Sequence, residues 1–191
     1  MNLALFYDTE TTGLPLFKEP SEHPDQPHIV QLAACLVDTD TRKTVASMDV
    51  IIKPDGWTIP AEVAAIHGIT TEHAADVGVP EVMAIDMLAA LWSQRLRIGH
   101  NESFDARILR IAQSRHGKPE NELGTWKEGK AECTCWLSRP HTKLEKNKLP
   151  KLGEAYQHFM GKPLENAHSA MADVHGCMAV YFALKDAPSA A

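Results

Sequence analysis

The sequence has few cysteines, no long apolar run and no excess of basic residues. Its 4 cysteines among 191 residues are scattered, so we expect reduced thiols and no disulfide framework. No apolar run approaches the roughly 20 residues that a membrane-spanning helix needs. The formal net charge of −6 is not typical of proteins that bind phosphate backbones over a broad surface. Net charge is a blunt measure, however, because carboxylates gathered in one cation site would also contribute to it.

Two local features narrow the class of protein further. Cys133 and Cys135 would share one face of a strand, and this spacing matches no structural zinc motif. At the N-terminus no basic leader precedes Asp8, which comes too early for a secretory signal peptide. We therefore expect a cytoplasmic protein that has no membrane partner and no structural zinc.

Strands and helices alternate along the chain after an initial run of strands. Apolar patterning predicts strands at 3–7, 29–37, 45–52, 96–100 and 131–137, and helices at 60–66, 71–76, 80–92, 103–115, 150–160 and 169–184. The proline-rich segment 14–28 is predicted to be a long surface loop. We expect residues 1–185 to form one α/β domain, with a mixed central sheet, an antiparallel N-terminal meander and flanking helices. The tail 186–191 is expected to fray.

The first predicted strand ends in two carboxylates, Asp8 and Glu10, one position apart. Side chains alternate along a strand, so these two project to one side while Thr9 points to the other. Like charges held side by side repel each other unless a cation or a shared proton lies between them. The pair therefore suggests a divalent-metal site, and the alternative is an ordinary polar turn after a strand.

Two further places combine acids with helix starts. Asp105 lies in the first turn of a predicted helix, where an acid can simply complement the helix dipole. Asp173 lies near the start of the last predicted helix, five positions after His168. Five helical steps leave two side chains about 140° apart around the axis, so the two cannot share a helix face. If they cooperate, His168 must reach the site from the loop before the helix, with Ser169 as the candidate cap.

Three segments of the chain together resemble known motifs: FYDTETTGL at 6–14, GHNESFDARIL at 99–109 and AHSAMADV at 167–174. In this order they are similar to the three motifs of the DnaQ-like, or DEDDh, 3′→5′ exonucleases, which include polymerase proofreading subunits, RNase T and oligoribonuclease. A fourth segment, IHGIT at 66–70, is similar to an intermediate motif of the same family. The loop 14–28 is longer and richer in proline than in compact members. The resemblance implies an RNase H-like fold.

The resemblance also implies a reaction and a set of catalytic residues. Two Mg²⁺ or Mn²⁺ ions would be bound, and Asp8 would bridge both of them. Glu10 and Asp173 would bind the ion on the side of the nucleophile, and Asp105 would hold the other ion, partly through water. His168 would be the general base, because imidazole titrates near neutral pH. The expected function is hydrolysis at the 3′ end of single-stranded DNA, in proofreading or repair, with release of nucleoside 5′-monophosphates.

The same resemblance implies substrate contacts and partners. The residues expected to contact the substrate are Thr11, Thr12, Leu14, His67, Asn101 and Phe104. For Phe104 a place in the core is an equal alternative. The expected partner is the 3′ end of a single-stranded nucleic acid, and a DNA polymerase is a further candidate partner. A basic run at 139–151 either follows phosphates upstream of the cut or is a solvated loop.

Three other functions compete with this interpretation. The enzyme could trim RNA from the 3′ end, since the sequence contains no clear selector for the 2′-hydroxyl group. An aspartyl-phosphate phosphatase would use Asp8 as its nucleophile, but it needs a second aspartate where Glu10 stands. A polymerase-associated module that binds nucleic acid without catalysis would have no reason to keep four acids and His168.

Overall fold

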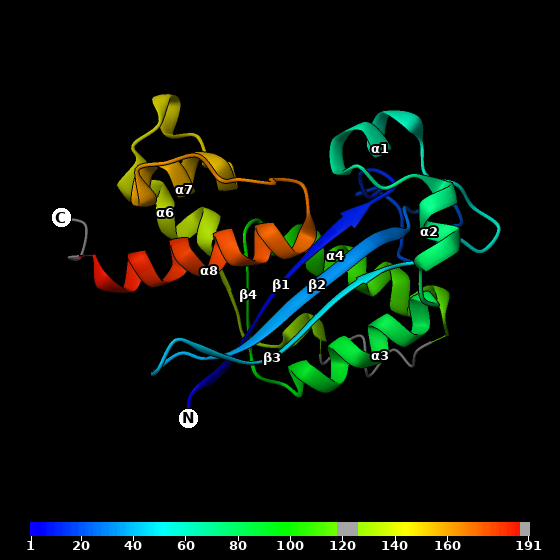
Figure 1. Ribbon diagram of the computed structural model, residues 1–191, viewed down its shortest axis with the longest axis horizontal. Helices are drawn as coiled ribbons and strands as arrows, with labels where there is room; N and C mark the ends of the chain where they lie inside the picture. The colour runs from blue at the N-terminus through cyan, green and yellow to red at the C-terminus, as the bar shows by residue number, and fades with distance from the viewer. Residues whose placement is uncertain (118–125, 188–191) are drawn as a thin grey trace.

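The computed structural model describes residues 1–117 and 126–187 of the chain, which form one central sheet with helices on both faces (Figure 1). The sheet has five strands in the order β3-β2-β1-β4-β5. The strands are β1 (Leu3–Thr11), β2 (Ile29–Asp38), β3 (Lys43–Ile51), β4 (Leu96–Gly99) and β5 (Ala131–Cys133). β1, β2 and β3 pair antiparallel, whereas β4 pairs parallel with β1 and β5. The predicted mixed sheet with an N-terminal antiparallel meander is therefore confirmed.

The helices pack on the two faces of this sheet. They are α1 (Ala61–His67), α2 (Thr71–Val77), α3 (Glu81–Trp92), α4 (Glu102–Arg115), α6 (Thr134–Thr142), α7 (Leu152–Met160) and α8 (Ala170–Asp186), with a short 3₁₀ helix η1 (Glu145–Asn147). α3 and α4 cover one face, and α8, joined by α6 and α7, covers the other (Figure 1). Within the described ranges, no helix combines the length and the apolar character needed to cross a membrane.

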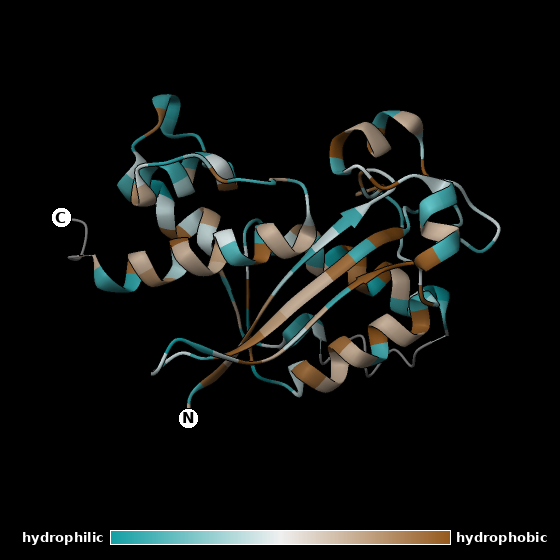
Figure 2. Cartoon of the chain, viewed as in Figure 1, coloured by the Kyte–Doolittle hydropathy of each residue, from teal (hydrophilic) through white to brown (hydrophobic). Residues whose placement is uncertain are grey.

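Alternating side chains of β1 supply the core on each face. Leu5 and Tyr7 are buried with residues of α3 and α4, and Trp126 belongs to the same cluster. Ala4 and Phe6 are buried on the opposite face against α8. Figure 2 shows the central strands as mainly apolar, as a strand buried on both sides must be. The alternation continues past the core, so it directs residue 9 towards α4 and residues 8 and 10 towards α8.

The long loop 14–28 has neither helix nor strand, as predicted, but it is held in place. The side chain of Gln26 is buried within it, accepts a hydrogen bond from the Leu16 amide at 3.0 Å and donates one to the Pro20 carbonyl at 2.9 Å. Arg115 of α4 donates to the Gln26 and Pro27 carbonyls. The prolines exclude regular structure, and the side chains of Gln26 and Arg115 supply partners for four backbone groups of the loop.

The segment after β4 differs most from the prediction. The expected strand 131–137 is only three residues long, and the helix α6 begins at Thr134. Cys135 consequently lies on a helix, and the prediction that Cys133 and Cys135 share a strand face is wrong. The hydroxyl of Ser138 donates to the Thr134 carbonyl, one turn back in the same buried helix face. Tertiary packing here overrides the β preference of the local sequence.

The ends of the other elements shift by a few residues. β1 extends to Thr11, so both carboxylates of the first motif lie inside the strand rather than after it. α8 continues to Asp186, whose carboxylate pairs with Arg42 at 2.8 Å. Of the tail that we expected to fray, residues 188–191 lie outside the described part of the chain.

Candidate active site

Four carboxylates meet where β1 ends. Asp8 and Glu10 project from β1 on the face covered by α8, and Asp173 lies in the first turn of that helix. Asp105 lies in the first turn of α4, which covers the opposite face. The strand thus ends between the starts of two helices, and each helix contributes one acid (Figure 1). The pairing with β2 shifts register directly after Glu10, which marks the irregularity that ends the ladder.

Asp105 reaches this site because Thr9 holds its side chain. Its Oδ1 atom accepts hydrogen bonds from the Thr9 amide at 3.0 Å and from the Thr9 hydroxyl at 2.7 Å. Both residues are buried, and Thr9 points towards α4 as the alternation requires. The two bonds fix one carboxylate oxygen at the edge of β1, so the acid from the far face lies beside Asp8.

His168 and Asp173 approach Glu10 from the α8 side. Ligand atoms of these three residues lie within 4.8 Å of one another. His168 stands in the loop before α8 with a φ of 69°, and its amide lies 3.3 Å from Oδ2 of Asp173, to which it donates. The geometric prediction that His168 comes from the loop is therefore confirmed. Ser169 is the first cap residue of α8, but its side chain makes no capping hydrogen bond.

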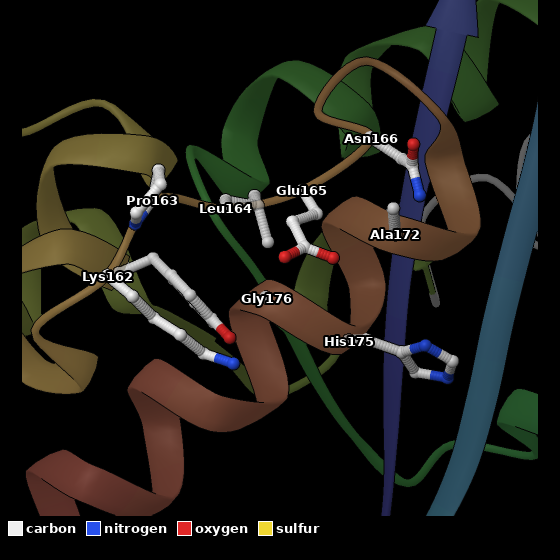
Figure 3. Close-up of a pocket in the computed structure, with 9 residues that line it drawn as sticks. Lys162, Pro163, Leu164, Glu165, Asn166, Ala172, His175 and Gly176 are labelled. Atoms are coloured by element: carbon white, nitrogen blue, oxygen red, sulfur yellow. The ribbon is translucent and has the colours of Figure 1, made fainter.

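The loop that carries His168 is packed closely on α8. Figure 3 shows Leu164 and Asn166 of this loop above the helix surface around Gly176. A Cβ atom at Gly176 would lie 3.1 Å from both methyl groups of Leu164, so glycine permits this close approach. The carbonyl of Asn166 also accepts the Ser169 amide at 3.2 Å. These contacts set the position from which His168 reaches the acids.

Burial raises the pKa of every acid in the cluster, and repulsion from the other acids adds to the rise at Asp8 and Glu10. Burial, followed by the charges of Asp105, Asp173 and Glu10, holds the pKa of Asp8 well above its usual range. Burial, followed by the charges of Asp173 and Asp105, raises the pKa of Glu10 to about 8. Burial raises the pKa of Asp105 to about 7, against the lowering effect of the Thr9 hydrogen bonds. Burial also raises the pKa of Asp173, whose Oδ1 atom is buried without a partner.

This donor set fits divalent cations. Hard cations such as Mg²⁺ and Mn²⁺ prefer carboxylate oxygens, and their charge would offset the repulsion that raises these pKa values. One ion could reach ligand atoms of Glu10, His168 and Asp173 at the same time. The Oδ1 atom of Asp173 has no hydrogen-bond partner that would compete with such an ion. The site therefore combines an electrostatic need for cations with the ligands to bind them.

The residues that follow β1 shape the turn beside the acids. The Thr11 hydroxyl donates to the Gly13 carbonyl at 2.8 Å, and the Thr12 hydroxyl accepts the His28 amide at 2.9 Å. Both threonine side chains thus stabilise the turn, whereas Leu14 is 74% exposed and free to contact a ligand. The contact roles that we expected for these three residues remain predictions.

His67 faces the site from α1 with a defined tautomer. Its Nδ1 atom accepts the Ile69 amide at 3.1 Å, so the ring proton resides on Nε2. Nε2 is buried without a partner, and burial followed by the charge of His168 lowers the pKa of His67. His67 is therefore a neutral hydrogen-bond donor close to His168.

Asn101 and Phe104 flank the start of α4. Asn101 is the cap residue of this helix, exposed, with a φ of 67° and no capping bond from its side chain. Phe104 is half-buried and packs against the core on the α3–α4 face. Its packing agrees with the core alternative, and neither residue contacts the acids through a hydrogen bond among those described.

A buried network beneath Asp105 was not expected from the sequence. Glu102, one turn before Asp105, accepts the Tyr7 hydroxyl at 2.8 Å and Arg97 Nε at 3.0 Å. Arg97 also donates to the Trp126 carbonyl and lies over the Trp126 ring. These contacts fix the first turn of α4 to β1 and β4. The alternation of β1 indicates that residues 7 and 9 lie on one face, but it does not identify Glu102 and Asp105 as their partners.

The whole chain is similar to known exonucleases. It matches the family described as RNase_T, exonuclease, over residues 5–181. It is 26% identical over 185 residues to an uncharacterized exonuclease, CP81, of Escherichia phage 186, and the match covers 94% of this chain and 87% of the phage protein.

Solved structures of E. coli exonuclease I have the same fold. A zinc-bound complex of that enzyme with single-stranded DNA gives a TM-score of 0.76 at 22% identity. Its complex with a dA16 oligonucleotide gives 0.72 at 22% identity. Each match covers 97% of this chain but 41% of the exonuclease I chain, so this chain spans less than half the length of those structures. The likeness confirms the expected RNase H-like fold.

Proposed function

The chain belongs to the RNase_T exonuclease family, and from this premise we propose that it hydrolyses single-stranded DNA from the 3′ end and releases nucleoside 5′-monophosphates. One observation carries the proposal: four carboxylates and His168, distant in sequence, converge at the end of β1 in the arrangement that the three motifs imply. The choice of single-stranded DNA is supported by the exonuclease I complexes, which contain such oligonucleotides.

Four acids of this chain would hold two Mg²⁺ or Mn²⁺ ions: Asp8, Glu10, Asp105 and Asp173. Bound ions of this kind stabilise charge on the attacking and the leaving oxygen of a phosphodiester. The charges of Asp105, Asp173 and Glu10 all act on Asp8, which supports the proposal that Asp8 would serve both ions. Thr9 orients Asp105, and the loop packed on α8 orients His168.

His168 would remove the proton from the attacking water. It is exposed and comes from a loop, so its ring can approach a water molecule beside Glu10 and Asp173. Imidazole exchanges protons near neutral pH, which suits a general base.

His67 and Leu14 would receive the terminal nucleotide. The Nε2–H group of His67 is a buried donor without a protein partner, and such a group gains free energy when a substrate oxygen accepts its hydrogen bond. The exposed side chain of Leu14 offers apolar area to a base or sugar.

Product analysis on end-labelled oligonucleotides tests the proposal. A 5′-labelled single strand should shorten stepwise, and a 3′-labelled strand should yield a labelled mononucleotide, only when Mg²⁺ or Mn²⁺ is present. Asp8→Asn should abolish both reactions, while Asp76→Asn, which changes an exposed acid on α2, should leave them unchanged. Hydrolysis by Asp8→Asn at the wild-type rate would show that the site is wrongly assigned. A matched RNA strand in the same assay decides between deoxyribonuclease and ribonuclease activity.

A further inference from the structure

The two sides of the acidic site differ in chemistry. On the side of α1 the exposed residues include the apolar Leu14 and Ile66. On the other side stand the start of α7 and the loop before α8 (Figure 1). A cavity of about 370 Å³ opens there. Its lining includes Lys151, which caps α7, and Glu154 in the first turn of α7, together with His168 and Asp173. The active-site residues thus share a cavity wall with a lysine.

A chain of contacts extends from this cavity to further cations. Glu154 accepts the Lys151 amide at 2.7 Å and the Lys148 ammonium group at 3.0 Å. Beyond Lys148, the side chain of Asn147 accepts Arg139 Nε at 3.0 Å. These contacts therefore connect the cavity beside the acids to the surface formed by η1 and the end of α6.

This basic segment, residues 139–151, carries five cations against one acid, Glu145. The five cations are Arg139, Lys143, Lys146, Lys148 and Lys151. Beside it Trp136 is 56% exposed, and the guanidinium group of Arg139 lies 5.4 Å from the centre of its ring. The neighbouring Leu137 is 40% exposed as well, so the two residues offer apolar surface directly beside the cations.

The backbone of the basic segment adopts a specific conformation. Lys143, Lys146 and Asn147 have φ values of 47°, 53° and 56°, in the left-handed region that costs free energy for residues with a side chain. Such conformations persist only where the surrounding structure imposes them. Figure 2 shows the same segment as predominantly hydrophilic. The backbone of the segment is thus set by the surrounding structure, although none of its five cations is buried in the core.

We propose that the basic segment and Trp136 bind the single strand upstream of the scissile bond, through its phosphates and one base. The strand would run from the acids across the Lys151 cavity to Lys148, Lys146 and Lys143, and a base would stack on Trp136. Phosphates suit these lysines, and an exposed aromatic ring stacks on any base without regard to sequence. This inference rests on the proposed function and assigns the partner of the basic segment.

Strand length provides the discriminating measurement. Binding of 5′-fluorescein-labelled dT12 and dT3 is measured by anisotropy, with Mg²⁺, in an Asp8→Asn background that prevents hydrolysis. Lys143→Glu/Lys146→Glu should weaken dT12 binding roughly tenfold or more in 0.1 M salt and reduce the slope of log K against log salt by about 1.4 for two lost contacts. Binding of dT3 should not change if the strand runs as proposed, because its two internucleotide phosphates would be taken up beside the acids and Lys151, before Lys146 and Lys143.

A matched control separates a local contact from a change in net charge. Lys43→Glu/Lys53→Glu alters the charge equally at two exposed positions outside the basic segment, so it should affect dT12 much less. Equal weakening by both double variants, or equal effects on dT12 and dT3, would overturn the proposal. A parallel rU12 titration tells whether the surface accepts RNA as well.

Trp136 gives an independent variant. Trp136→Ala should weaken dT12 binding about fivefold or more through lost stacking, and Trp136→Phe should restore most of it. Unchanged dT12 binding by Trp136→Ala, in a protein whose thermal unfolding is normal, would refute the stacking contact. If the proposed function were wrong but this inference right, the results would differ from those above. The wild-type protein would leave the 3′ end of dT12 intact, while its binding would still depend on strand length and on Lys143, Lys146 and Trp136.

Discussion

Replacement of Thr9 by valine tests whether this residue positions Asp105. Valine keeps the shape of threonine but cannot donate the hydrogen bond of 2.7 Å to Oδ1 of Asp105. A hydrogen bond to a charged group contributes about 1.5 to 3 kcal/mol, and each 1.36 kcal/mol corresponds to a tenfold change in an equilibrium constant. The remaining bond from the Thr9 amide should keep Asp105 near its place. We therefore expect apparent metal affinity at neutral pH to fall by about 10- to 100-fold.

The dependence on pH distinguishes this effect from general damage. Burial raises the pKa of Asp105 to about 7, and the hydroxyl of Thr9 opposes that rise. Without the hydroxyl the pKa of Asp105 should rise further, so protons compete more strongly with the cation. The loss of affinity should be largest near pH 6 to 7 and should diminish as the pH approaches 9, where the carboxylate is ionised in both proteins.

Isothermal titration with Mn²⁺ and activity as a function of metal concentration provide the measurements. Thr39→Val serves as the control, because the Thr39 hydroxyl donates to the Asn2 carbonyl, in the β2–β3 turn. A wild-type metal midpoint in Thr9→Val would refute the positioning role of Thr9. A weakening that does not vary with pH would refute the link to the ionisation of Asp105.

The remaining predictions concern stability and turnover. In the folded protein the pKa of Glu10 is raised to about 8 and that of Asp105 to about 7, whereas both carboxyls titrate near pH 4 in the unfolded chain. The folded state therefore binds more protons than the unfolded chain between pH 4 and 8. The metal-free protein should consequently lose stability as the pH rises through this range. Thermal unfolding in EDTA at several pH values measures this loss of stability. Added Mg²⁺ should raise Tm more at pH 8 than at pH 5. A Tm that increases with pH in EDTA would contradict the raised pKa values of the two acids. Arg97→Met leaves Glu102 as an uncompensated buried charge, so the free energy of unfolding measured in urea should fall by about 3 to 5 kcal/mol. A fall below about 1 kcal/mol would show that the hydrogen bond from Tyr7 alone is enough to stabilise the Glu102 carboxylate. His168→Ala should lower kcat by about 100-fold or more while Mn²⁺ affinity by titration falls much less, and an unchanged kcat would remove His168 as the base.

Much of the fold followed from local patterns in the sequence. Apolar runs predicted β1 and β2, and Pro60 and Gly68 bracketed α1 because proline starts and glycine ends a helix without cost. The polar turn between β2 and β3 predicted the hairpin. These features depend on residues close together in the chain, so no knowledge of tertiary contacts was needed. The same holds for the loop origin of His168, which helical geometry alone required.

The contacts across the sheet could not be predicted in this way. Nothing near Asp105 in the sequence indicates that Thr9, 96 residues away, holds its carboxylate. The helix α6 was mistaken for a strand because its β-branched and aromatic residues favour strands locally, while burial of Cys135 and Ser138 decides the outcome. Both features arise from packing between distant segments, which composition and periodicity do not report.

The register of β1 connects the stability of the core to the geometry of the site. Leu5 and Tyr7 must face α3 and α4, and Ala4 and Phe6 must face α8, because a shift by one residue would move each set into the opposite core, where its side chains do not fit the partners present. The same alternation carries Thr9 to Asp105 and directs Asp8 and Glu10 towards Asp173. Hydrophobic burial in the first half of the strand therefore selects the positions of the acids in its second half. The repulsion among those acids can be tolerated without a cation because the register is fixed by residues that do not take part in the chemistry.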